Sequence, residues 1–234
     1  MCFLRARRKG LSISLKEHGG IMAQASVAKF LLSARAVEQF PRPLDFEAAF
    51  FGRSNVGKSS LLNTYTGVSK LARVSGTPGC TREINFFLID NKYYLVDLPG
   101  YGYARYSKDE QQRWAELINE YISLRASRIL GVVILDIRRG LTDLDVMLLD
   151  ILKSHDVNYI IVATKIDKLK TNELRAATLL LKSQIKSAGF DGDIIRFSSV
   201  TGEGKKELYN NITKKYQHYK ELQKEKTDGV FVDE

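Results

Sequence analysis

Cysteine is scarce in this chain, because its 234 residues include only Cys2 and Cys80. Two cysteines cannot form the disulfide framework of a small secreted domain, and neither has the CxxC or His-rich spacing of a zinc site. Long apolar runs are also missing, since no stretch approaches the roughly 18 residues of a membrane-spanning helix. The final residues, VFVDE, carry no prenylation box. These absences favour a protein of the reducing cytoplasm that is not bound to a membrane.

Negative charge is in short supply, with 27 Asp and Glu against 36 Lys and Arg and a formal net charge of +9. A hydrophobic content of 44% over this length is enough to bury a large core, which excludes a disordered chain. The basic excess favours a polyanionic partner such as RNA or an anionic membrane, although a basic surface also serves solubility.

The two ends of the chain differ in composition from the part between them. Residues 1–21 form a basic leader whose apolar stretch, LSISL, is too short and too polar for the core of a signal peptide. Because Met22 follows directly, we expect this leader to be either a disordered arm or an overextended start. Residues 225–234 are expected to form a flexible, solvated tail. A single domain is therefore predicted over residues 22–224.

The apolar pattern predicts strands that alternate with helices. Four continuous runs are typical of strands covered on both faces of a parallel sheet: Phe46–Phe51, Ile129–Ile137, Tyr159–Ala163 and Ile194–Phe197. Helical spacing is found over Ser59–Tyr65, Lys108–Leu124, Asp143–Lys153, Asn172–Lys186 and Lys205–Lys224. In the second of these, one apolar face holds Trp114, Leu117, Ile118, Tyr121 and Ile122, and Ser107 with Glu110 predicts a capping box.

One segment breaks this alternation. INFFLIDNKYYLVDLPG has two apolar stretches joined at Asn91-Lys92, which is too short a connection for a crossover helix and predicts an antiparallel hairpin. The predicted fold class is therefore α/β, with three layers: a six-stranded, mostly parallel sheet with one antiparallel edge strand, and helices on both faces.

A phosphate-binding loop is predicted between the first predicted strand and helix, where GRSNVGKS matches G-x-x-x-x-G-K-[ST]. Its glycines allow backbone N–H groups to turn onto a phosphate, and the following helix adds the positive end of its dipole. We expect Lys58 to neutralise the β- and γ-phosphates and the Ser59 hydroxyl to bind Mg²⁺. A glycine-rich turn is the alternative, but the whole pattern is rare by chance. The candidate binding residues are Gly52, Arg53, Ser54, Asn55, Val56, Gly57, Lys58 and Ser59.

A second motif, D-x-x-G, ends the hairpin as Asp97-Leu98-Pro99-Gly100. Asp97 can hold the coordination shell of magnesium, and the Gly100 N–H can contact a γ-phosphate. Alone this motif is weak, because an aspartate that ends a strand is usually a cap or turn residue. Its position after a phosphate loop and a hairpin makes it specific.

A third motif indicates which base is bound. The run YIIVATKIDK ends in Thr164-Lys165-Ile166-Asp167, which is similar to the [NT]KxD base-recognition motif. The Asp167 carboxylate can accept hydrogen bonds from the N1–H and 2-amino groups of guanine, whereas adenine would leave it facing an acceptor. Lys165 is expected to lie along the base and Thr164 to tie this loop to the phosphate loop, unless both belong to a solvated strand end. Phe197, Ser198 and Ser199, followed by Val200, are expected to bring backbone groups to the guanine O6.

The segment between the phosphate loop and the hairpin, VSKLARVSGTPGCTREI, is rich in Gly, Ser, Thr and Pro and has no period of its own. This composition suits a segment that becomes ordered only when γ-phosphate and Mg²⁺ are present. Thr77 and Thr81 can both supply a magnesium-binding hydroxyl.

Six motifs together resemble one family, the EngB (YihA/YsxC) ribosome-assembly GTPases of bacteria in the TRAFAC class of P-loop GTPases. They are GRSNVGKSSLLN, TPGCTREINFF, VDLPGYGYA, LDIRRG, ATKIDK and FSSVTGEG, within a resemblance that covers about residues 26–220. The resemblance implies the P-loop GTPase fold and GTP and GDP as ligands. It also implies binding to a precursor of the large ribosomal subunit and its rRNA, and a link to cell division and septation. In this family Gly79, Cys80, Thr81, Arg82 and Glu83 would form the switch I element, with Thr81 on magnesium.

The position after D-x-x-G holds Tyr101, where many GTPases have a glutamine that orients the attacking water. With Lys58, Thr81 and Gly100 as the predicted catalytic residues, we expect slow hydrolysis that a partner accelerates. Asn55 resembles the P-loop asparagine that helps bind K⁺ in related GTPases; a hydrogen bond that closes the loop is an equally weighted alternative.

The sequence gives less specific signals for the surfaces that bind partners. Tyr101, Tyr103 and Tyr106, interleaved with Arg105, can stack on RNA bases or pack on the neighbouring helix. The lysines of the last predicted helix, which surround the apolar stripe Leu208, Ile212, Tyr216 and Tyr219, can contact phosphates or form a solvated face. A monomer is expected. The rival classes are a P-loop kinase or ATPase, a nucleotide-binding scaffold without turnover, and a vesicle-trafficking G protein.

Overall fold

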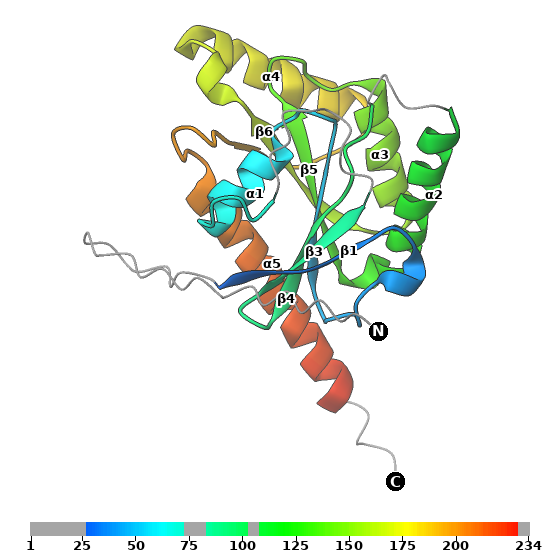
Figure 1. The fold of residues 1–234 in the computed structure, drawn as a ribbon. Coiled ribbons are helices and arrows are strands. Elements are labelled where there is room, and N and C mark those ends of the chain that lie inside the picture. Colours follow the sequence, from blue (N-terminus) through cyan, green and yellow to red (C-terminus); the bar gives the residue numbers. More distant parts are fainter. Residues whose placement is uncertain (1–26, 73–82, 103–107, 229–234) are drawn as a thin grey trace, which may run out of the picture.

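A computed structural model describes residues 27–72, 83–102 and 108–228 as one sheet covered by helices (Figure 1). The sheet has seven strands in the order β1-β3-β4-β2-β5-β6-β7. Their bounds are β1 Ala28–Ala34, β2 Glu47–Gly52, β3 Ile84–Ile89, β4 Tyr93–Asp97, β5 Ile129–Asp136, β6 Asn158–Thr164 and β7 Ile194–Arg196. Every residue of β2, β4 and β5 is buried, as their continuous apolar sequences predict.

The hairpin of β3 and β4 is confirmed. The two strands pair antiparallel, while β2, β4, β5, β6 and β7 pair parallel with one another. The turn lies one residue earlier than predicted, because Asp90 and Asn91 both have positive φ angles, of 49° and 56°. These angles are those of a type I′ turn, whose twist matches that of the flanking strands.

The prediction of six strands is wrong, because the sheet has a seventh strand, β1. It pairs antiparallel with β3, so β3 lies one place in from the edge and β1 forms the edge itself. The sequence AKFLLSA gives neither clean alternation nor a fully buried run, since Lys29, Phe30 and Leu31 are exposed at consecutive positions. Edge strands are paired along one side only, and a short mixed pattern of this kind is therefore easily missed.

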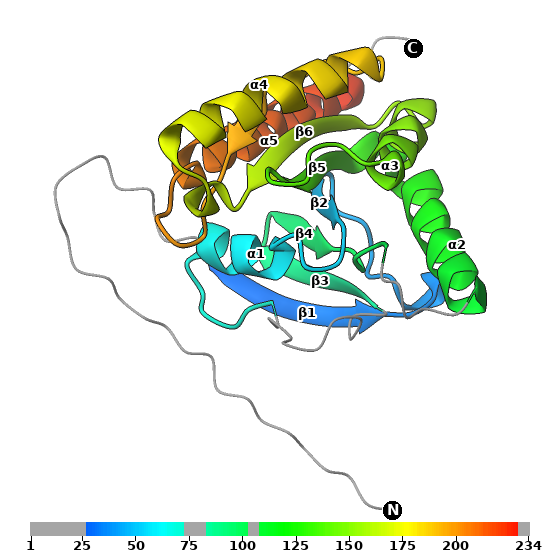
Figure 2. The same cartoon turned by 90° about the horizontal axis from the view of Figure 1, so that it is seen from above.

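The five α-helices of the described residues form the two outer layers. They are α1 Lys58–Thr66, α2 Lys108–Arg125, α3 Asp143–Ser154, α4 Thr171–Ser187 and α5 Lys205–Asp228. Buried residues of α2, α3 and α4 pack against one face of the sheet, and those of α1 and α5 against the other. Figure 2 shows α2 and α3 at one side of the sheet and α1 at the other. The predicted three-layer α/β fold is confirmed.

The helices lie close to the residue ranges predicted from the sequence. The apolar face of α2 buries Leu117, Ile118, Tyr121 and Ile122 as predicted, whereas Ser107 and the side chains of Glu110 and Trp114 lie outside the description. Helix α5 runs four residues beyond its predicted end, through Asp228. In the described part of the chain, no helix combines the length and apolar character needed to cross a bilayer.

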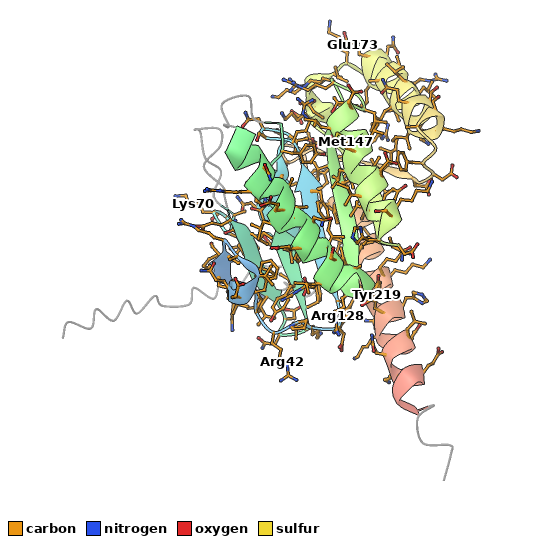
Figure 3. The ribbon with its side chains drawn as sticks, turned by 90° about the vertical axis from the view of Figure 1, so that its right-hand side faces the viewer. Arg42, Lys70, Arg128, Met147, Glu173 and Tyr219 are labelled. Carbon is orange, nitrogen blue, oxygen red and sulfur yellow. The ribbon has the colours of Figure 1, made fainter. Side chains whose placement is uncertain are left out.

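A buried ionic network fixes α2 to the start of β2. The fully buried Glu47 carboxylate pairs with the Arg125 guanidinium and accepts a hydrogen bond of 2.8 Å from the Tyr121 hydroxyl. Burial raises the pKa of Glu47, and the Arg125 charge opposes that rise. Arg125 also lies 5.4 Å from the ring centres of Phe40 and Phe86. Figure 3 shows Arg42 and Arg128 at this end of the molecule, opposite to Glu173.

Candidate functional site

The predicted motifs meet at one edge of the sheet. The carboxyl ends of β2, β4, β5 and β6 supply the phosphate loop, Asp97, Asp136 and Thr164, and these four strands are neighbours. Parallel strands place their carboxyl ends together, which is where open α/β sheets bind ligands. The sequence pattern alone therefore explains why residues far apart in the chain gather here.

The phosphate loop has the backbone that its glycines predict. Gly57 has φ +102° directly before α1, a conformation that a side chain would strain. At Gly52 there is no room for a side chain, since an added Cβ would lie 2.8 Å from the Val56 Cγ1. Asn55 also has a positive φ, of 66°. The loop thus turns tightly from the buried strand β2 into the first turn of α1.

Lys58 and Asp97 form a nearly buried ion pair at the centre of the site. Their residues are only 8% and 3% exposed, so each charge depends on the other for compensation. Ser59 follows in the first turn of α1, and its hydroxyl makes no hydrogen bond to the described residues. A hydroxyl and a carboxylate are hard oxygen donors, and this donor set fits Mg²⁺.

The D-x-x-G segment packs directly on the phosphate loop. The Ser54 hydroxyl lies 3.2 Å from the Gly100 carbonyl oxygen, and the Ser54 N–H donates to the Tyr101 carbonyl at 2.9 Å. A Cβ on Gly100 would lie 3.0 Å from the Ser54 nitrogen, so a side chain here would fit only if the phosphate loop shifted by a few tenths of an ångström. Leu98 and Pro99 are buried behind this contact. Hydrogen bonds of Ser54 thus connect the two motifs directly.

Tyr101 points away from the phosphate loop. Its hydroxyl donates a hydrogen bond of 2.7 Å to Oδ1 of Asp145, on α3, and the residue is 6% exposed. Burial, together with the adjacent Asp145 charge, raises the pKa of Tyr101 well above its ordinary value. The other oxygen of Asp145 accepts from the Thr142 N–H and hydroxyl at 2.9 and 2.6 Å. Sequence reasoning missed Asp145, which offered only the signal of a capping box with Thr142.

The predicted tie between the base loop and the phosphate loop is present. The Thr164 hydroxyl lies 2.7 Å from the Val56 carbonyl oxygen and 3.0 Å from that of Leu135. The Lys165 ammonium donates to the Asn55 carbonyl at 2.5 Å and lies 3.0 Å from Oδ2 of Asp136. Thr164 and Lys165 thus both contact the phosphate loop.

Asp167 and Ser198 bring the last two strands together at the predicted base position. The Ser198 hydroxyl, which is fully buried, donates to Oδ1 of Asp167 at 2.8 Å. It also accepts the N–H groups of Val200 and Thr201 at 3.1 and 3.2 Å. Burial acts to raise the pKa of Asp167, but hydrogen bonds from Ser198 and Lys168 outweigh it, so the pKa is lowered. The carboxylate is therefore ionised and held in place at neutral pH.

The remaining predicted residues fall into two groups. The side chains of Ile166 and Phe197 are buried in the two apolar cores, so only their backbones face the site; Ser199 is half-buried beside them. Gly79, Cys80, Thr81, Arg82, Tyr103, Arg105 and Tyr106 lie outside the described residues. Glu83 is described, and its carboxylate pairs with Nε of Arg35 at 2.5 Å.

Asp136 is a site residue that the motif search did not single out. It ends β5, and its carboxylate binds Arg138 through Nε at 2.9 Å and Nη2 at 2.7 Å, besides Lys165. Burial acts to raise its pKa, but the hydrogen bonds from Arg138 and Lys165 lower it to about 2. The sequence signal that could have identified Asp136 is the aspartate of LDIRRG, which follows a buried apolar run and lies at the same edge of the sheet as the other motifs.

A phosphate loop joined by a hydrogen bond to a base-recognition loop is the arrangement of a P-loop GTPase, and the comparisons agree. Residues 47–165 match the family model described as the 50S ribosome-binding GTPase. The chain is therefore a GTPase of the P-loop class.

More similar relatives narrow this to one family. The "Probable GTP-binding protein EngB" of Clostridium kluyveri is 45% identical over 77% of this chain and 91% of its own length. Its counterpart in Clostridium acetobutylicum is 44% identical over 79% and 92%. A crystal structure of a probable GTP-binding protein engB matches with a TM-score of 0.60 and 26% identity, covering 74% of this chain and 99% of that one. The chain belongs to the EngB family of GTP-binding proteins.

Proposed function

We propose that this GTPase acts in the cytoplasm as a nucleotide-dependent switch during assembly of the large ribosomal subunit, with a link to cell division and septation. The observation that carries the proposal is the match of residues 47–165 to a family described as ribosome-binding GTPases. The formal charge of +9 supports it, because rRNA is a polyanion.

The site geometry supports a defined division of roles. The amides of residues 52–59 would hold the phosphates, and Asp167 would read guanine while Lys165 and Thr164 hold the base loop. The Ser59 hydroxyl and the Asp97 carboxylate would hold Mg²⁺, and Thr81 stays a prediction for the same ion. When bound, Mg²⁺ would neutralise charge between the β- and γ-phosphates.

The Lys58–Asp97 pair gives each of two nearly buried charges a counter-ion. A γ-phosphate would take Lys58 as its counter-ion, and Asp97 would then be free to support the metal. Two buried charges thus exchange partners on binding, and neither is left unpaired.

Hydrolysis by the isolated protein is expected to be slow. The Tyr101 hydroxyl is occupied by Asp145, and its ring packs in the core cluster of the α2–α3–α4 face. A partner is therefore expected to complete the site, as arginine fingers do in other GTPases. Potassium is a further proposal: the Asn55 side chain forms no hydrogen bond within the described residues, which leaves it available to an ion. Equal turnover in KCl and NaCl would refute a role for K⁺.

Co-sedimentation tests the proposed function. Protein loaded with a non-hydrolysable GTP analogue should pellet with large-subunit precursors, and GDP-loaded protein should remain largely in the supernatant. The Asp167→Asn variant, supplied with the same analogue, serves as a control for nucleotide occupancy. Equal pelleting in both nucleotide states would contradict a switch. Competition of ATP with GTP would favour the rival class of P-loop kinases and ATPases.

A further inference from the structure

A cavity of about 370 Å³ lies on the outer side of the phosphate loop, between that loop and α3. Its walls come from residues 53–56, the end of β5, the segment 138–142 and Gly102. The volume is in the range of small-ligand sites. The cavity borders the proposed GTP site, because residues 53–56 and Lys165 line it, whereas Lys58, Ser59, Asp97, Asp167 and Ser198 do not.

The lining is strongly ionic, with Arg53, Arg138, Arg139 and Lys165 against Asp136 and Asp145. Both carboxylates are already satisfied, Asp136 by Arg138 and Lys165, and Asp145 by Tyr101 and Thr142.

Two cations remain, because the Arg53 and Arg139 side chains form no ion pair or hydrogen bond with the residues that the structure describes. The Arg53 side chain lies beside Gly102, since its Nε would be 3.3 Å from a Cβ added there. The cavity therefore carries an uncompensated charge of two guanidinium groups.

We propose that this cavity binds one nucleotide of a single-stranded RNA, with its phosphodiester held between Arg53 and Arg139. Guanidinium groups bind phosphate oxygens in pairs, and they also stack on unpaired bases. The volume exceeds that of a carboxylate side chain and suits a phosphate with its sugar or base, which favours RNA over an acidic protein. This proposal rests on the proposed ribosomal function and specifies where RNA touches the GTPase.

The position of the cavity gives RNA a direct route to the nucleotide site. Residues 53–56 form one wall of the cavity and also part of the phosphate loop. Lys165 contacts the carbonyl oxygen of Asn55 in that wall and is part of the base-recognition motif. An RNA phosphate bound here would alter the positions of both motifs, so RNA and GTP should change each other's affinity by the same factor.

Binding of a fluorescent, mixed-sequence single-stranded RNA to the full chain, loaded with a non-hydrolysable GTP analogue, tests the site. Arg139→Glu should weaken binding about tenfold or more, because it removes a phosphate contact and adds a like charge. Arg139→Ala should lower the slope of log affinity against log salt by about one. The matched controls are Arg175→Glu and Arg175→Ala, at an exposed position of α4 outside the cavity, which should change affinity less than about twofold.

Several outcomes overturn the proposal: equal losses at Arg139 and Arg175, no loss at Arg139, or polyglutamate competing as well as RNA. The Arg139 side chain forms no hydrogen bond or ion pair with a described residue of the proposed GTP site, so its variants should bind and hydrolyse GTP normally. If the Arg139 variants bind RNA as the wild type does, while co-sedimentation with ribosomal precursors depends on the nucleotide, only the proposed RNA site is wrong. If RNA binding depends on Arg139 but co-sedimentation is the same in both nucleotide states, the proposed switch function is wrong. The proposed RNA site is then still supported.

Discussion

The Tyr101 hydroxyl donates a hydrogen bond of 2.7 Å to Asp145, and both residues are nearly buried. This bond joins the segment after D-x-x-G to α3 at the position where many GTPases have a catalytic glutamine. The backbone of Tyr101 also accepts from Ser54 in the phosphate loop. Tyr101 is thus a structural link between three segments, and we expect another group to orient the attacking water.

Tyr101→Phe is expected to lower stability and to leave intrinsic hydrolysis nearly unchanged. The variant keeps the ring but leaves a buried carboxylate oxygen short of one donor, which costs about 2 kcal/mol. Urea unfolding and single-turnover hydrolysis measure the two effects.

A matched variant is Tyr65→Phe, whose hydroxyl lies 3.5 Å from that of Tyr93 and makes no hydrogen bond to a carboxylate of the described residues. It should cost clearly less stability than Tyr101→Phe. A tenfold drop in intrinsic hydrolysis by a folded Tyr101→Phe protein would show that the hydroxyl takes part in the reaction.

The parts that sequence predicted well depend on local patterns. Buried strands give continuous apolar runs, and the phosphate loop requires glycine at fixed places, so β2, β5 and residues 52–59 were found with small boundary errors. Thr164 was predicted to contact the phosphate loop because it is part of the [NT]KxD motif, and the parallel strands of the structure end at one edge, which brings the two loops together.

The parts that sequence missed depend on contacts between distant residues. Strand β1 exists because β3 offers it a partner, and its own seven residues are too mixed to show this. Asp145 and Tyr101 are 44 positions apart, and Glu47 and Arg125 are 78 apart. No spacing rule links such pairs, and a charged residue in an isolated sequence predicts exposure more readily than burial.

Thr164→Val is expected to weaken GTP binding about tenfold. Valine keeps the shape of threonine but removes the hydroxyl that contacts the carbonyl groups of Val56 and Leu135. One lost buried hydrogen bond is worth about 1.4 kcal/mol, which corresponds to that factor. Thr164→Ser retains the hydroxyl and should bind nearly as the wild type does, as calorimetry can measure. Equal weakening in both variants would point to the methyl group.

Asp167→Asn is expected to lower GTP affinity at least a hundredfold and to create binding of xanthosine triphosphate. The amide can accept from N1–H and donate to the carbonyl that xanthine has in place of the 2-amino group of guanine. Ser198 would still donate to the remaining oxygen, so the loop should keep its structure. Asp193→Asn, at an exposed position, is the control and should retain GTP preference. Unchanged GTP affinity in Asp167→Asn would remove this residue from the base site.

The stability conferred by Asp136 should depend on pH in the acid range. Its pKa is about 2 in the folded protein against an ordinary 3.8, so the carboxylate stabilises the fold above the ordinary value. That contribution is lost as the pH falls through the interval between 3.8 and 2. The difference in unfolding free energy between wild type and Asp136→Asn should therefore shrink from about pH 5 to about pH 3. Urea unfolding across this range measures it, and a constant difference would contradict the assignment.

A double-mutant cycle on Lys58 and Asp97 should show different effects on stability and on nucleotide binding. Lys58→Met or Asp97→Asn alone leaves one charge nearly buried without its partner, which is expected to cost about 3 kcal/mol in the nucleotide-free protein. The double variant should recover most of that loss, because neither charge remains. None of the three should bind GTP and Mg²⁺ tightly, since both groups are proposed ligands.

The same cycle on Arg196 and Glu203 is the control, because this pair is 3.7 Å apart and both side chains are 50% exposed. Its coupling energy should be below about 0.5 kcal/mol, as solvent screens exposed charges. If the losses at Lys58 and Asp97 simply add, the two charges do not compensate each other in the nucleotide-free protein. The exchange of partners proposed for GTP binding would then have no energetic basis, even if both residues contact the ligand.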